Sequence, residues 1–520
     1  MTRTNRLLRH AFIALSALLG GYSAQANNIQ VTNSALAGNT GTSVQVQFDL
    51  SWENSWRLGS GRWDAAWVFV KYRTSLTGPW FHANVNNTGH VAAAGSQIDP
   101  GLLSPVTAYN ASSNPVVGVF IYRDAAGTGN LSLPGTQLQW NFAAQGLDIS
   151  DIAQVQVFAI EMVYVPQGAF AAGSGGTETN AFTLTTINTA TATTVPAGTG
   201  TLGGEAGGFP TGQTAPTSAS WPNGFNDFYC MKYELTQQGF VDCLNTLTYA
   251  QQVTRTASAP TSAAGTGALN STNANRNGID IQTPGVANTT PAVYACNLDG
   301  DAVFGEAADG KDIACNFLAW GDLTAYLDWS GLRPMTELEF EKACRGTIAP
   351  VANGYPWGNT GVAGSTYTLA NAGATNEGIA TNYSTTLGNA SYNITDGTID
   401  GPLRAGIFAA NGANSGRVTA GASYYGIMEL GGNLWERPVT LGNANGQAYT
   451  GVHGNGTLAT DGNPDAPAWP AVSTASGSGW RGGAWSHGPA NTQLSDRQFA
   501  TNTDPTRLNN TGGRGARLAP

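Results

Sequence analysis

The sequence predicts an α+β protein in which an N-terminal β-sandwich precedes a larger, loop-rich unit. Two observations carry this prediction. Between residues 27 and 160, short apolar stretches alternate with turn residues, and no stretch of useful length has a helical period. This is typical of strands that each bury one face. After residue 161, segments that open with helix-capping residues are separated by long stretches rich in small and polar residues, which predicts a few short helices among irregular loops.

The first 26 residues have the pattern of a secretory signal peptide. Three arginines precede an apolar stretch from Ala11 to Leu19, and an Ala-Gln-Ala cleavage site ends at Ala26. The apolar stretch is too short to span a bilayer. We therefore expect a protein exported to the periplasm, the cell surface or the medium, with no membrane span.

The composition argues against a nucleic-acid partner. Only 11% of the residues are charged and the formal net charge is −10, whereas nucleic-acid binding needs a basic surface.

The predicted β-sandwich covers residues 27–160. Its clearest strand is at residues 44–50, where four apolar side chains alternate with polar ones. Further apolar stretches lie at residues 67–70, 116–121, 138–140 and 155–158. No catalytic group of residues is evident here, so we expect an adhesion or assembly module that allows self-assembly of the chain.

The second unit, residues 161–520, opens with an apolar strand that ends in Pro-Gln-Gly. Three stretches interrupt it and are interpreted as insertions, because they hold few large apolar residues that could pack. They are residues 183–220, 254–291 and 372–423.

Three helices are predicted in this unit. Thr236 is placed to cap the first, whose apolar residues recur on one face. Asp322 is expected to begin the second. Thr336 begins the third and forms a capping box with Glu339.

The five cysteines are an odd number for an exported protein, so at least one is left without an intramolecular partner. Cys296 and Cys315 bracket an acidic stretch and are the best candidates for a disulfide. Cys344 lies on a predicted helix face, where a buried thiol acts as a small hydrophobic residue.

The acidic stretch between those cysteines has oxygen-bearing side chains at alternate positions, Asn297, Asp299 and Asp301. This spacing suits a calcium loop. The alternative is a solvated acidic hairpin, since Ala302 stands where a helix–loop–helix calcium loop needs glycine.

A glycine-rich segment, residues 426–436, reads Gly-Ile-Met-Glu-Leu-Gly-Gly-Asn-Leu-Trp-Glu. Three glycines within seven residues disfavour a regular helix or strand, so we expect a tight loop with Trp435 buried in a core. Three more motifs occur around it: the helix start at residues 329–341, Tyr-Pro-Trp-Gly-Asn at residues 355–359, and Arg-Gly-Gly-Ala-Trp at residues 481–485.

With these motifs in this order, residues 161–520 resemble the sulfatase-modifying-factor family, which includes the formylglycine-generating enzymes. The resemblance implies a variant of the C-type lectin fold. It also implies a calcium site in the glycine-rich loop, with carboxylates from Glu436 and Glu429 and backbone carbonyls from Gly432 and Leu434.

The enzymes of this family oxidise a substrate cysteine with two active-site cysteines that bind copper. Counting onward from Trp485, those positions fall on His487 and Thr492, and no cysteine follows Cys344. Cu(I) needs soft thiolate ligands. The departure from the family pattern therefore implies that copper is not bound and that no catalytic residue stands at these positions.

Short polar residues near the C-terminus suit recognition of a protein or glycan ligand instead. The residues expected to bind it are Trp485, His487, Asn491, Thr492, Asp496 and Arg497. The alternative for Asp496 and Arg497 is an internal ion pair, with the other residues merely solvated.

Three hypotheses of function follow from the sequence. The one we favour is an exported, non-catalytic ligand-binding or surface-assembly protein. The second is a formylglycine-generating-type oxidase that acts on a protein cysteine through unusual ligands. The third is a structural subunit of an extracellular filament or sheath, with contacts between chains made by the N-terminal unit.

Overall fold

The computed structural model describes residues 28–59, 61–101, 116–190, 201–202, 205–206, 220–270, 272–395, 397 and 399–520. The predicted signal peptide, residues 1–26, lies outside them. None of the helices in these ranges is long and apolar enough to cross a membrane.

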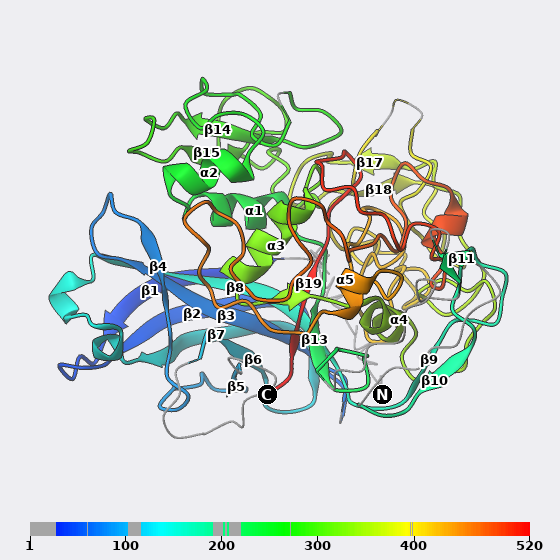
Figure 1. The fold of residues 1–520 in the computed structure, drawn as a ribbon, viewed down its shortest axis with the longest axis horizontal. Helices are drawn as coiled ribbons and strands as arrows, with labels where there is room; N and C mark the ends of the chain where they lie inside the picture. The colour runs from blue at the N-terminus through cyan, green and yellow to red at the C-terminus, as the bar shows by residue number, and fades with distance from the viewer. Residues whose placement is uncertain are drawn as a thin grey trace, which may run out of the picture.

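One antiparallel sheet of eight strands runs through the centre of the molecule (Figure 1). Its main path is β16, β19, β13, β8, β3, β6 and β5, and β4 also pairs with β3. The strands are β3 Asp64–Arg73, β4 Trp80–Ala83, β5 Ser96–Pro100, β6 Val119–Arg123, β8 Gln154–Val165, β13 Phe228–Met231, β16 Arg333–Pro334 and β19 Gly515–Leu518. Because β8 crosses residue 160, the sheet contains strands from both predicted units.

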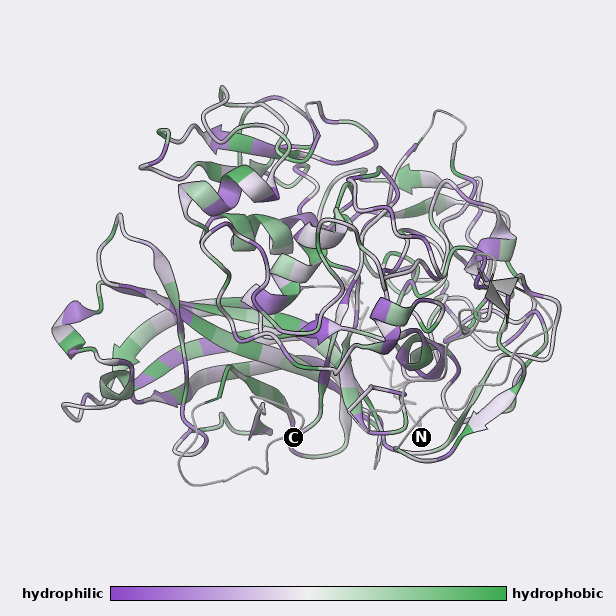
Figure 2. Cartoon of the chain, viewed as in Figure 1, coloured by the Kyte–Doolittle hydropathy of each residue, from purple (hydrophilic) through white to green (hydrophobic). Residues whose placement is uncertain are grey.

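A second sheet packs on the N-terminal part of the first. It consists of β1 (Gln30–Ala37), β2 (Val44–Arg57) and β7 (Gly127–Trp140). The alternation predicted from residue 44 onward is confirmed, because every second residue of β2 is buried up to Trp52. These side chains share one hydrophobic cluster with residues of β3 such as Val68, and Figure 2 shows the hydrophobic residues concentrated on the central strands. That residues 27–160 form a β-sandwich domain separate from the rest of the chain stays a prediction.

The predicted helices are present, with one shifted start. They are α1 Gln237–Leu244, α3 Trp320–Trp329 and α4 Glu337–Arg345, joined by α2 Tyr249–Arg255 and the short α5 Ala444–Gln447. Thr236 caps α1, and Thr336 and Glu339 form the capping box of α4. The helix expected to begin at Asp322 begins at Trp320, because the Asp322 carboxylate reaches back to the N–H of Ala319 at 3.0 Å.

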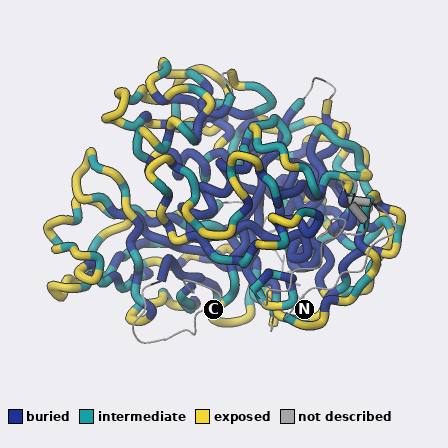
Figure 3. The backbone as a smooth tube through the Cα atoms, viewed as in Figure 1, coloured by how far each residue is buried: buried dark blue, intermediate teal, exposed yellow. Residues whose placement is uncertain are grey.

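The loop-rich part of the chain is well packed despite its lack of regular structure. Within the predicted insertion 254–291, Leu269 and Ile279 are buried in the same cluster as α1 and α3. Within residues 372–423, Leu403 and Phe408 belong to a small core of their own. Figure 3 shows the buried backbone continuing through this half of the molecule. The third predicted insertion, 183–220, lies largely outside the described residues.

The remaining strands form two-stranded pairs at the periphery. They are β9 Phe170–Ala172 with β10 Thr185–Ile187, β11 Thr201–Leu202 with β12 Glu205–Ala206, β14 Ile279–Thr283 with β15 Val293–Cys296, and β17 Thr368–Ala370 with β18 Gly378–Thr381. Short 3₁₀ turns occur at Phe142–Gln145, Ile149–Asp151 and Pro489–Thr492.

All five cysteines are buried free thiols, so the disulfide predicted between Cys296 and Cys315 is absent from this structure. Cys296 and Cys315 both belong to the hydrophobic cluster that contains the buried residues of α1 and α3. Burial raises the pKa of each thiol well above its ordinary value, which disfavours the thiolate needed for disulfide formation. The buried position predicted for Cys344 is confirmed.

Candidate functional site

The glycine-rich loop at residues 426–436 is the tight, irregular turn that the sequence predicts. Four of its residues have positive φ angles, including Glu429 and Asn433, which are not glycine. At Gly432 the φ angle is +94°, and a Cβ atom would stand 2.5 Å from the carbonyl oxygen of Ser391. Only glycine fits at this position. The next residue, Asn433, holds the loop in place, because its side chain accepts a hydrogen bond from the N–H of Leu403 at 2.8 Å.

This loop inserts Trp435 into an aromatic cluster. The ring is 1% exposed, and its centroid lies 5.0 Å from His487, 5.3 Å from Phe499 and 5.8 Å from Trp480. The prediction that Trp435 is a major buried residue is therefore confirmed. The cluster joins the loop to the C-terminal segment, where the family's copper-binding cysteines would lie.

Most of the residues predicted to bind a ligand are in the interior. Trp485, Thr492, Asp496 and Arg497 are all buried. Trp485 packs with Leu434 in a small cluster. Of the six predicted residues, His487 and Asn491 are partly exposed. The sequence placed these side chains near one another but could not tell which of them face solvent.

Arg497 belongs to a buried ion-pair network on helix α4. Its Nε and Nη2 donate to the two oxygens of Glu337, at 2.8 and 2.9 Å. Arg481 bridges Glu337 (3.2 Å) and Glu341 (3.0 Å), which stand four residues apart and so share one helix face. The predicted internal ion pair thus involves Glu337 rather than Asp496. Arg497 is a structural residue and is not available to a ligand.

Asp496 has no arginine partner in this network. It accepts weak hydrogen bonds from the Asn491 side chain and from the N–H of Gln498, both at 3.4 Å. Burial raises the pKa of Asp496 to about 6.

His487 and Thr492, where counting from Trp485 predicts the family's cysteines, are locally bonded side chains. Nδ1 of His487 lies 3.2 Å from the Ser486 hydroxyl, and its ring stands edge-on to Trp435. Burial lowers the pKa of His487, which favours the neutral imidazole. The Thr492 hydroxyl donates to the carbonyl of Pro489 at 2.8 Å. The pair therefore offers one imidazole and one hydroxyl, which is not a donor set for Cu(I).

The predicted calcium ligands lie in a buried group rich in carboxylate. Glu234, Glu429 and Glu436 are all buried near Arg514, which pairs with Glu436 and also donates to the carbonyl of Glu429 at 3.2 Å. Oε2 of Glu429 and Oε2 of Glu436 have no hydrogen-bond partner among the described residues. Burial raises the pKa of Glu429 to about 7 and that of the other two acids above their ordinary value.

Carboxylate oxygens are the ligand type that a hard cation takes, but these three acids are not among the described groups whose ligand atoms lie within 4.8 Å of one another. Two orphan carboxylate oxygens and an excess of buried negative charge favour a divalent ion, and Gly432 and Leu434, the predicted carbonyl ligands, are buried in the same loop. Such an ion would share Glu436 with Arg514. Calcium binding here stays a prediction.

Chelation is expected to lower the melting temperature. At calcium concentrations about a hundredfold above Kd, binding adds about 2.7 kcal/mol, so EDTA should lower Tm by roughly 2–3 °C in a chain of this size. The shift should shrink in Glu429→Gln, which removes a charge but keeps an acceptor for the N–H of Gly406. It should persist in Asp124→Asn, which removes an exposed carboxylate outside both predicted calcium sites. Identical melting curves with and without EDTA would contradict calcium binding.

The acidic stretch at residue 297 differs from the predicted loop. Carboxylate oxygens of Asp299, Asp301 and Glu306 lie within 4.8 Å of one another, and all three residues are exposed. Asn297 is buried instead and donates to Oδ2 of Asp280 at 2.8 Å. Asn297 is thus part of the interior. Calcium binding by Asp299 and Asp301 stays a prediction.

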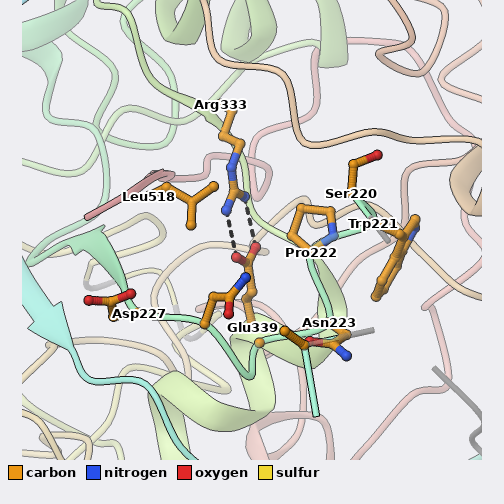
Figure 4. A pocket seen from close by; sticks show the side chains of 11 residues that line it. Ser220, Trp221, Pro222, Asn223, Asp227, Arg333, Glu339 and Leu518 are labelled. Atoms are coloured by element: carbon orange, nitrogen blue, oxygen red, sulfur yellow. Dashed lines mark hydrogen bonds and ion pairs between the residues drawn. The ribbon is translucent and has the colours of Figure 1, made fainter. Parts of the chain in front are cut away.

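A cavity of about 320 Å³ lies beside the start of α4 (Figure 4). Arg333 and Glu339 meet in it through two hydrogen bonds, at 2.6 and 2.8 Å. Both charges are thereby neutralised. Because Ala190 and Ser220, on its wall, flank a stretch that the structure does not describe, we assign no ligand to this cavity.

Comparison with protein families matches residues 150–518 to the sulfatase-modifying factor enzyme 1-like domain. This chain belongs to the sulfatase-modifying-factor family. The resemblance inferred from the motifs is confirmed, and the family domain begins before residue 161, so that it includes the whole of β8. Among curated proteins, no sequence matches significantly.

Sequence reasoning missed several residues that organise this family domain. Glu337, Arg481, Glu234 and Arg514 are all fully or almost fully buried and bonded to charged or polar partners. One feature of the sequence that could have indicated these residues was the low proportion of charged residues. When 11% of residues are charged, a charged residue inside a glycine- and tryptophan-rich motif is a candidate for a buried pair.

Proposed function

We propose that this chain is an exported, non-catalytic binding or surface-assembly protein that holds a protein or glycan ligand at the surface around His487 and Asn491. Export is inferred from residues 1–26 alone. The observation that supports a non-catalytic role is the bonding of His487 and Thr492. By the count from Trp485, these positions are where the family's enzymes are expected to carry thiolates, and each side chain bonds its own neighbours.

The surface around these residues suits a neutral or weakly polar ligand. His487 and Phe499 are partly exposed and rest on the buried Trp435. Asn491 and Gln498, which bond each other at 2.9 Å, add amide groups beside them. Rigid aromatic groups next to adaptable amides are typical of recognition surfaces.

The purified protein is expected not to convert cysteine to formylglycine. The test incubates the copper-loaded protein with a Cys-x-Pro-x-Arg peptide and measures loss of the thiol by mass spectrometry. The five cysteines are buried, and burial raises the pKa of every one of their thiols. Turnover that disappears when any of these cysteines is replaced by serine would favour the oxidase hypothesis and overturn the non-catalytic role.

The binding role is tested by screening the full mature chain against glycans and cell-surface extracts. Any ligand found should bind more weakly to Asn491→Ala, which removes a partly exposed amide without touching the Glu337 network. Leu76→Ala is the control, because Leu76 is 66% exposed and lies in the turn between β3 and β4, outside the family domain. A ligand that binds equally to both variants would show that the C-terminal surface is not its site.

A further inference from the structure

A pocket of about 490 Å³ lies where the N-terminal strands meet the segment 409–428. Trp56 of β2 and Arg62 of the following loop form one wall, and Lys232, just after β13, lines it as well. Trp56 and Arg62 precede residues 150–518, the part that matches the family. Membership of the family therefore does not account for this pocket.

The lining of the pocket is cationic. Arg62, Lys232 and Arg417 line it, and no aspartate or glutamate does. The charge of Lys232 is balanced by ion pairs with Glu161 at 2.8 Å and Asp64 at 3.8 Å. The two arginines supply the remaining positive charge, in a protein whose net charge is −10.

Neither arginine has a carboxylate within ion-pair distance among the described residues. Both guanidinium groups lie on Tyr424, with Cζ at 4.3 Å (Arg62) and 5.5 Å (Arg417) from the ring centroid. Arg62 donates to the Tyr424 hydroxyl, and Arg417 donates to the carbonyl of Pro356 at 2.7 Å. Two like charges that line one pocket repel each other, so an anion that contacts both arginines would be stabilised.

The rest of the pocket is mainly apolar, with one buried hydroxyl left without a partner. Trp56, Tyr425 and Met428 contribute to its walls, together with several alanines. Tyr425 is 4% exposed, and its hydroxyl has no hydrogen-bond partner among the described residues. Solvent does not reach this hydroxyl, so the arginines and the apolar side chains supply the ligand contacts of the pocket.

We propose that this pocket binds an organic anion in which a carboxylate is attached to an apolar ring or chain. The carboxylate pairs with Arg62 and Arg417, and the apolar part lies against Trp56 and Met428. A pocket of this size accommodates a small ligand, and mainly apolar walls disfavour a polyhydroxylated sugar, whose hydroxyl groups would lack partners. A free small acid and the C-terminus of a peptide ending in an apolar residue share this chemistry.

The test is isothermal titration of the full mature chain with 3-phenylpropanoate, its uncharged amide, N-acetylphenylalanine and glucuronate. We expect saturable binding of the two apolar carboxylates and at least tenfold weaker binding of the amide. Arg62→Gln should weaken binding roughly tenfold, as expected for loss of a charged hydrogen bond. N-acetylphenylalanine binding more tightly than phenylpropanoate identifies a peptide C-terminus as the ligand, whereas equal binding identifies a small acid.

Arg73→Gln is the matched control. Arg73 also stands over an aromatic ring, with Cζ 4.7 Å from the Trp80 centroid, but it does not line this pocket. Its replacement should leave binding unchanged. No saturable binding of either carboxylate, equal binding of the amide, or tighter binding of glucuronate would overturn the proposal. The pocket shares no residue with the surface around His487. A negative titration therefore leaves the proposed function standing, and a negative ligand screen leaves the carboxylate proposal standing.

Discussion

Replacing Glu337 with alanine is expected to lower the free energy of unfolding by about 3–5 kcal/mol. The carboxylate is fully buried and accepts hydrogen bonds from Arg497, Arg481 and the N–H of Leu441. Its removal leaves two buried guanidinium groups with too few partners. Loss of one member of a buried ion pair is costly for this reason, even where the intact pair adds little. Urea unfolding followed by circular dichroism measures the change.

The control for this variant is Glu306→Ala. Glu306 is exposed, and replacement of an exposed side chain usually changes stability by no more than about 0.5 kcal/mol. A loss below about 1 kcal/mol in Glu337→Ala would show that the network contributes little to folding.

The same network should make the protein sensitive to acid. Burial opposes ionisation of Glu337, but Arg497 and Arg481 outweigh it and hold the pKa of Glu337 below the ordinary value of 4.5. An acid whose pKa is lower in the folded state stabilises the protein above its unfolded pKa, and this contribution is lost as the pH falls through the folded pKa. Stability should therefore fall below about pH 4.5, and less steeply in Glu337→Ala.

Replacing Trp435 with alanine is expected to cost about 3–5 kcal/mol, because it removes a fully buried aromatic ring and leaves a cavity. The ring contacts Trp480, Phe499 and His487, so the cavity opens where the glycine-rich loop meets the C-terminal segment. The variant should be digested by proteases under conditions in which the unaltered protein is resistant.

Trp435→Phe separates the ring from its indole N–H. That N–H has no hydrogen-bond partner among the described residues, so phenylalanine should lose packing alone and cost less than half as much as alanine. Soluble, protease-resistant Trp435→Ala protein would show that the loop is peripheral to the fold.

Local features of the structure could be predicted from the sequence because their causes are local. Thr336 and Glu339 are three residues apart, and their capping box needs nothing from elsewhere in the chain. The alternation in β2 is likewise set by the two-residue period of a strand. The burial of Trp435 followed from the glycines around it, which exclude regular structure and favour a compact loop.

The ligand surface and the disulfide could not be predicted reliably, because both depend on contacts between distant residues. Arg497 and Glu337 are 160 positions apart, and the sequence around Arg497 suggested its neighbour Asp496 as the partner of an internal ion pair instead. Cys296 and Cys315 bracket an acidic stretch, but that spacing does not show that each thiol is buried in a hydrophobic core. Likewise, the buried residues of the insertion 254–291 pack only because α1 and α3 provide a surface.

The place of β19 in the central sheet determines when this protein can finish folding. The strand lies between β13 and β16, and Arg514, just before it, bonds the carbonyl of Met231, 283 positions earlier. Until residues 515–518 have left the ribosome, β13 and β16 each lack a neighbour, and unpaired strand edges promote aggregation. Folding therefore cannot proceed to completion from the N-terminus onward. A chain that stops before β19 should accumulate as an aggregation-prone intermediate rather than as a slightly weakened protein.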